Sequence, residues 1–192
     1  MVQKALAERP AALRHLPVRL LFEDEGRFGR INDTRRCWMP LPERPVVGQQ
    51  VVREYIYSFV AVSPWDGQFS ALTLPYADAA SMGIFLAHTA QEFAGQYCVM
   101  FVDGAGWHVA KELPIPPTVR LLTLPPYSPE LNPAEHIWED LRENDFRNDV
   151  IESLDAVVDR LGQGIRRLAA NPDYVQRLTC FDWIKTIRMT SN

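Results

Sequence analysis

The stretch YCVMFVD at residues 97–103 decides the fold of this 192-residue chain. Six apolar residues in an unbroken run, without the alternation of a half-exposed strand, are typical of a strand buried on both faces of a parallel sheet. A second short apolar run follows at Val119–Leu124. The two runs predict neighbouring buried strands in an α/β domain, and the first of them ends in an acid, Asp103.

The chain before this stretch predicts three more strands and a helix. The apolar residues of Arg19–Asp24 predict a first strand that ends at an acid. Glu54–Ser63 and Gln68–Leu74 predict a β-hairpin, because turn-forming residues join them. Ala77–Gly95 has the apolar spacing of a helix, with Gly95 as its stop signal. From Glu25 to Gln50, glycines, prolines and arginines predict an irregular excursion or a loose hairpin.

The chain after the second buried strand predicts helices. One would run from Asn132 to Phe146, with Asn132 as its cap and Pro133 in the first position. A longer one would cover about Glu152–Ala169, and the tail 173–187 would be partly helical. Strand, hairpin, helix, two strands and helices in this order predict a mixed five-stranded sheet flanked by helices. This is the element order of the ribonuclease H-like α/β fold.

Composition and cysteine usage limit the class of protein. A hydrophobic content of 47% predicts a globular domain, with residues 1–18 as a leader or linker and 19–192 as the domain. Cys37, Cys98 and Cys180 are odd in number and far apart, which favours neither disulfides nor zinc and suggests a cytoplasmic protein. No apolar stretch approaches the ~20 residues that span a bilayer, so no membrane partner is expected.

The charge of the chain is unevenly distributed. The net charge is −4, but residues 1–53 hold ten Lys and Arg against six Asp and Glu, whereas 54–192 hold ten against eighteen. A basic first part could lie along phosphates while acids in the remainder bind metal, although ordinary scatter of surface charge explains the counts equally well. Within the basic part, Arg27, Arg30, Arg35 and Arg36 are candidates for DNA contacts, with a solvated basic loop as the alternative.

Three acids stand at chemically informative positions: Asp24 and Asp103 at the ends of predicted strands, and Glu135 near the start of a predicted helix. Neighbouring strands lie ~4.8 Å apart, so acids at matching ends can share a cation. Hard oxygen ligands are those that Mg²⁺ prefers, and a third carboxylate permits a pair of ions. The pattern therefore predicts a divalent-metal site suited to phosphodiester chemistry.

Each acid also has a purely structural explanation. Asp24 stands between Glu23 and Glu25, so all three could be solvated acids at a strand end. Asp103 precedes a glycine, and Asp in that position is common in turns. Glu135, third after Asn132, could complete a capping box. The joint placement of the acids on the right elements, in the right order, favours the metal site.

Three segments carry a resemblance to a known family: FEDE at 22–25, VDGAGWH at 102–108 and LPPYSPELNPAEHIW at 124–138. They resemble the catalytic motifs of mariner-like DDE transposases, above all of the bacterial insertion-sequence branch. The resemblance extends from about Leu20 to about Ile184.

This resemblance implies a transposase catalytic domain with Asp24, Asp103 and Glu135 as the catalytic and metal-binding triad. It implies two Mg²⁺ ions, or Mn²⁺ in their place, and cleavage and transfer of DNA strands at transposon ends. It also implies a homodimer on DNA, acting in the bacterial cytoplasm at the nucleoid. The N-terminal helix-turn-helix modules of such transposases have no counterpart before Asp24.

Two other functions fit the same residues. One is a nuclease of this fold that only hydrolyses DNA, and the other is an inactive remnant or regulatory partner of a full-length transposase. His108 is a candidate accessory residue near the metals, with a turn histidine without a catalytic role as the alternative. We expect it to matter less than the triad, because metal ions rather than imidazole would activate the nucleophile.

Overall fold

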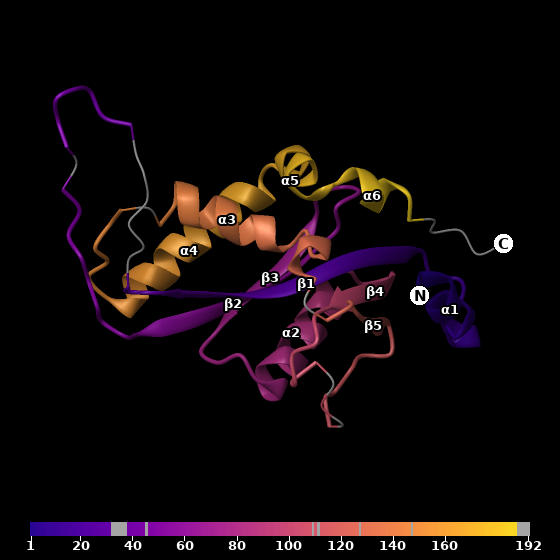
Figure 1. The fold of residues 1–192 in the computed structure, drawn as a ribbon. Coiled ribbons are helices and arrows are strands. Elements are labelled where there is room, and N and C mark those ends of the chain that lie inside the picture. Colours follow the sequence, from indigo (N-terminus) through magenta and orange to yellow (C-terminus); the bar gives the residue numbers. More distant parts are fainter. Residues whose placement is uncertain are drawn as a thin grey trace.

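The computed structural model describes residues 1–31, 38–44, 46–108, 110, 112–126, 128–146 and 148–187. Its centre is a five-stranded sheet with the strand order β3-β2-β1-β4-β5 (Figure 1). The strands are β1 (Val18–Gly29), β2 (Tyr55–Val62), β3 (Phe69–Leu74), β4 (Tyr97–Val102) and β5 (Val119–Thr123). β1, β4 and β5 are parallel, whereas β2 and β3 pair antiparallel, so the predicted mixed sheet is confirmed.

Helices cover both faces of the sheet (Figure 1). They are α1 (Val2–Ala7), α2 (Ala79–Glu92), α3 (Glu135–Asn144), α4 (Leu154–Ala169), α5 (Pro172–Thr179) and α6 (Asp182–Lys185), with 3₁₀ turns η1 (Ala11–Leu13) and η2 (Pro129–Leu131). α2 lies on one face and α3, α4 and α5 lie on the other. All six residues of β4 are buried as a result, which explains its unbroken apolar sequence.

The alternation of β1 divides the core in two. Leu21 packs with Met82 and Phe85 of α2 on one face. Phe22 belongs to the cluster on the opposite face, together with Trp138 of α3. Successive residues of a strand point to opposite faces, so Asp24 shares the α3 face, and Glu23 and Glu25 share the α2 face. This division positions the candidate site.

The first strand is longer than predicted. The sequence predicts its end at Asp24, but β1 continues to Gly29 because its antiparallel pairing with β2 extends to the pair Gly29 and Tyr55. The predicted excursion therefore begins later than Glu25. Beyond Gly29, its described residues, 30–31, 38–44 and 46–50, contain no helix or strand.

The N-terminal residues pack on the sheet. Leu6 is 7% exposed and lies in a cluster with Leu20, Tyr97 and Val99, near the start of β1 and β4. The domain boundary at residue 18 stays a prediction, but the leader contacts the core rather than extending from it. Within the described residues, no helix combines the length and apolar character needed to cross a membrane.

One buried carboxylate ties the three helices on the α3 face together. Asp140 of α3 is 6% exposed and accepts hydrogen bonds from Arg167 of α4 and Tyr174 of α5. Gly164 of α4 lies directly against α3, because a Cβ there would stand 2.5 Å from Leu141 Cδ2. The position of α3, which begins with Glu135, is therefore set by this packing.

Gly164→Ala tests the close contact of α3 and α4. The added methyl group would overlap Leu141, so we expect a loss of about 1–3 kcal/mol in the free energy of unfolding, measured by urea denaturation. Gly162→Ala in the same helix is the control, since its nearest neighbour is the end of the Arg166 side chain at 3.3 Å. That variant should be neutral or gain up to about 1 kcal/mol from helix propensity. Equal effects of the two substitutions would contradict the packing argument.

Candidate active site

Two of the predicted acids meet where β1 and β4 separate. The parallel pairing of these strands ends at Phe22 and Phe101, and Asp24 and Asp103 each follow two residues later. An unshifted register places both side chains at the same level on the same face of the sheet. Beyond this point β1 pairs with β2 alone, which leaves an opening beside the two acids.

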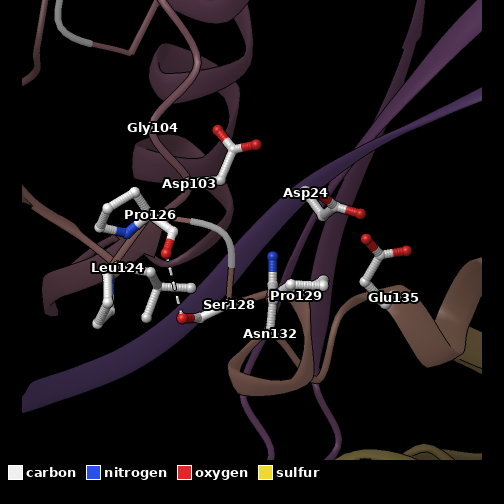
Figure 2. A pocket seen from close by; sticks show the side chains of 10 residues that line it. Asp24, Asp103, Gly104, Leu124, Pro126, Ser128, Pro129, Asn132 and Glu135 are labelled. Carbon is white, nitrogen blue, oxygen red and sulfur yellow. Dashed lines mark hydrogen bonds between the residues drawn. The ribbon is translucent and has the colours of Figure 1, made fainter.

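The third acid reaches the same opening from α3. Glu135 is the first residue of that helix, and its carboxylate and that of Asp24 point toward each other (Figure 2). The three acids line one pocket of about 370 Å³, together with Gly104, Leu124, Pro125, Pro126, Ser128, Pro129 and Asn132. The structure thus brings together all three predicted triad residues.

Asn132 holds this arrangement in place in a way the sequence analysis did not predict. It was expected to cap the following helix, but it ends the 3₁₀ turn η2, and α3 begins at Glu135 without a side-chain cap. The amide Nδ2 of Asn132 donates to the Glu23 carbonyl at 2.8 Å, and its Oδ1 accepts from the Ala134 N–H at 3.2 Å. The capping-box explanation of Glu135 is therefore wrong, and Asn132 instead ties the start of α3 to β1.

Asp24 lies in an environment that opposes its negative charge. Burial and the nearby charge of Glu135 raise its pKa to about 8, although the Trp138 indole donates a hydrogen bond of 2.7 Å to Oδ2. The indole can pack this closely against β1 because residue 26 of the strand is a glycine. A Cβ on Gly26 would lie 2.7 Å from Trp138 Cδ2. Three carboxylates that line one pocket, one of them disfavoured as an anion, suit a divalent cation, although the ligand atoms that lie within 4.8 Å of one another in the described residues are those of Glu23, Glu25 and His108.

Asp103 is held by donors from the turn that follows β4. Its Oδ1 accepts from the Ala105 N–H at 2.8 Å and lies 2.8 Å from His108 Nδ1. The hydrogen bond from His108 lowers the pKa of Asp103, and the Ala105 amide acts in the same direction against burial. The pKa of Asp103 is thus lowered, whereas that of Asp24 is raised.

His108 is buried among carboxylates on the α2 side of β1. Its Nε2 lies 2.9 Å from Glu25 Oε1 and 3.3 Å from Glu23 Oε2. Burial lowers the pKa of His108, but its contacts with Asp103, Glu25 and Glu23 outweigh burial and raise the pKa to about 10. A charged imidazolium thus connects the turn after β4 with β1.

Glu23 and Glu25 are the site residues that the sequence analysis missed. The explanation of 23–25 as solvated strand-end acids is wrong, because Glu23 is fully buried and the Glu25 side chain is 7% exposed. Burial raises the pKa of Glu23 well above its ordinary value. The side-chain alternation of β1 could have indicated their burial, because it places both residues on the face opposite Asp24, the same face as the core residue Leu21.

The predicted DNA-contact arginines differ in their surroundings. Arg27 is exposed, with its guanidinium 4.7 Å from the centre of the Tyr55 ring. Arg30 instead pairs with Glu54 at 2.9 Å and donates a hydrogen bond to the Ile151 carbonyl. Its guanidinium is therefore already bound by groups of the protein itself. Arg35 and Arg36 lie outside the described residues.

A mixed sheet that carries two acids at the separation of its central strands, with a third on the next helix, defines a ribonuclease H-like protein. The sequence model of the DDE superfamily endonucleases matches residues 19–158, and the chain belongs to this family. The resemblance found in the sequence is confirmed at the level of family. An uncharacterised protein of Sinorhizobium fredii, y4pE/y4sA, is 34% identical over 130 residues, covering 67% of this chain and 96% of that protein.

Solved structures of the Mos1 mariner transposase share the fold. The pre-cleavage Mos1 transpososome matches with a TM-score of 0.55 at 14% identity, over 93% of this chain and 59% of the Mos1 chain. The Mos1 paired-end complex with Mn matches with a TM-score of 0.53 at 16% identity, over 94% and 61%. This chain therefore spans about six tenths of the Mos1 chain, and the likeness confirms the predicted ribonuclease H-like fold.

Asp24→Asn tests the charge conflict in the metal-free protein. A folded-state pKa above the unfolded value means that the folded state binds more protons between about pH 4 and pH 8, so stability falls as pH rises through this window. The neutral amide should remove this loss and raise Tm in EDTA at pH 8, by roughly 2–4 °C for each kcal/mol recovered. Glu139→Gln, on the exposed side of α3, is the control. A gain as large at pH 4.5 as at pH 8 would refute this origin.

Proposed function

We propose that this chain is the catalytic domain of a transposase that cleaves DNA strands and joins the freed ends to target DNA. The observation that carries the proposal is the convergence of Asp24, Asp103 and Glu135 on one open pocket in a DDE superfamily endonuclease. The Mos1 complexes that share the fold contain transposon ends, which supports DNA as the partner.

The three acids would hold two Mg²⁺ or Mn²⁺ ions. The fit rests on the donor set: three carboxylates line one pocket, and a divalent cation would offset the burial and the repulsion from Glu135 that raise the pKa of Asp24. When bound, such ions activate the attacking oxygen and stabilise charge on the phosphate and the leaving oxygen. The Mos1 complexes with Mn and with Mg are consistent with this choice of metal.

The residues of the chain would act by binding and orientation. The indole N–H of Trp138 fixes Asp24, the turn after β4 fixes Asp103, and α3 presents Glu135. In the first reaction, water attacks the phosphorus, the P–O3′ bond breaks and a 3′-hydroxyl is freed. In the second, that hydroxyl attacks a target phosphodiester and displaces another 3′ oxygen. Both are in-line displacements, so one pocket can serve both.

Substitution of the triad tests this function. Asp24→Asn, Asp103→Asn and Glu135→Gln keep side-chain volume but each remove an anionic ligand, so we expect losses on the order of 10³-fold or more in Mg²⁺-dependent cleavage. Mg²⁺ should raise Tm of the parent protein and do so less in each variant. Glu139→Gln, one turn along α3 from Glu135, should behave as the parent.

The outcomes separate the competing functions. Cleavage of DNA without joining of a pre-cut 3′ end to target DNA would identify a hydrolytic nuclease. A parent protein that binds metal but neither cleaves nor joins would indicate a regulatory partner. Normal cleavage and an unchanged metal-induced Tm shift in Asp24→Asn would refute the triad assignment.

DNA binding should be weak, unselective between sequences and steeply dependent on salt, because the net charge is −4 and the basic residues are concentrated in 1–53. Arg27→Ala should reduce the slope of log affinity against log salt by about one, as expected for a phosphate contact. Arg30→Ala should instead lower stability, because Arg30 pairs with Glu54. Fluorescence anisotropy over a salt series measures the slopes of the parent and of Arg27→Ala, and urea denaturation measures the stability of Arg30→Ala. Nanomolar, sequence-selective binding would contradict this prediction.

A further inference from the structure

A side-chain bridge links the two central strands beyond the end of their backbone pairing. It runs from Glu25 of β1 through His108 to Asp103, with distances of 2.9 Å at Nε2 and 2.8 Å at Nδ1. The His108 side chain is fully buried. The strand residues beyond Phe22 and Phe101 have no backbone pairing with each other, so this bridge spans the gap.

The end of the bridge on β1 is rigid. Glu25 pairs with Phe59 in the antiparallel ladder, which fixes its backbone. Its Oε1 also accepts a hydrogen bond of 2.8 Å from the Trp107 indole, next to His108 in the chain. Glu23 Oε2 lies 3.3 Å from His108 Nε2, but among the residues that the structure describes neither oxygen of Glu23 has a hydrogen-bond partner, whereas Glu25 Oε1 lies within hydrogen-bond distance of Nε2 at 2.9 Å. Glu25 therefore provides the directed contact to Nε2.

The opposite end of the bridge meets a half-exposed carboxylate. The side chain of Asp103 is 52% exposed, and its contacts with His108 and Ala105 both go to Oδ1. Two donors on Oδ1 limit the rotation of the carboxylate and leave the lone pairs of Oδ2 available as ligands. Partners of this kind, behind the ligands of a metal, typically change metal affinity by roughly 10–100-fold.

We propose that His108, anchored by Glu25, is a positioning residue that orients Asp103 for metal binding. This inference rests on the proposed function, because it takes Asp103 as a metal ligand. His108 itself need not touch the ions or the DNA. His108 acts mainly through its contact with Asp103, by reducing the rotational freedom of that carboxylate, and Glu25 holds the imidazole in place for this contact.

Two substitutions of His108 separate the ends of the bridge. In His108→Asn, the amide nitrogen falls near the place of Nδ1 and can still donate to Asp103. In His108→Gln, it falls near the place of Nε2 and can reach Glu25 but not Asp103. Mn²⁺ affinity, measured by isothermal titration calorimetry on the full chain, should fall about 10–100-fold in His108→Gln and less than about 5-fold in His108→Asn. Cleavage by His108→Gln should return to near the parent rate at saturating Mn²⁺.

Controls distinguish positioning from a general effect on folding. His136→Gln, on the exposed part of α3, should leave Mn²⁺ affinity unchanged. Equal losses of affinity in His108→Asn and His108→Gln would overturn the inference, as would a rate defect of His108→Gln that excess Mn²⁺ does not restore. If Mn²⁺ binding disappears in both variants but survives in Asp103→Asn, then Glu23, Glu25 and His108 hold the ion themselves, and the inference is also wrong.

The calorimetry also separates this inference from the proposed function. If Asp103→Asn abolishes Mn²⁺ binding while His108→Gln binds like the parent, positioning by His108 fails and the metal site stands. If the parent binds no Mn²⁺, or Asp103→Asn and Glu135→Gln bind it unchanged, the proposed function fails with the inference.

Discussion

Electrostatic repulsion at the separation of β1 and β4 is the constraint on which the site depends. The register that pairs Phe22 with Phe101 brings Asp24 and Asp103 to one level, and α3 adds Glu135. Burial, followed by repulsion from Glu135, disfavours the ionised state of Asp24 and raises its pKa, and the charge of Asp103 adds to this. The surrounding structure keeps the acids together at this electrostatic cost, because strand pairing and helix packing fix their backbones.

The two aspartates are held by donors from opposite sides of the sheet. Trp138 of α3 donates to Asp24, and this requires the close approach of the indole to Gly26. Asp103 is held by the turn after β4, whose histidine is anchored to Glu25. Asp24 thus depends on the packing of α3, while Asp103 depends on contacts near the α2 face. A substitution in one of these supports should leave the carboxylate held by the other in place.

Most of the fold could be predicted from local patterns, and the departures have a common cause. Buried strands and long helices show in the sequence because apolar periodicity is a local property. The end of β1 is not local: pairing with β2 carries it to Gly29, through residues with no strong strand pattern. Asn132 was assigned a local cap, but its amide binds the carbonyl of Glu23, more than 100 positions away in the sequence. Long-range contacts outweigh local propensity in both cases.

The candidate triad could be predicted because its motifs are short and ordered, whereas its supporting residues could not. Glu23 and Glu25 look like solvated acids until the α2 face is known to be closed around them. Because side chains alternate along β1, the three consecutive acids have different surroundings: Asp24 faces the pocket, and Glu23 and Glu25 face the buried His108. Rotation of the half-exposed Asp103 carboxylate would weaken the binding of an ion, and the bridge from Glu25 through His108 limits that rotation. The acidic run of β1 therefore presents a candidate ligand, Asp24, on one face and, on the other, Glu25 as the anchor of the bridge that reaches Asp103.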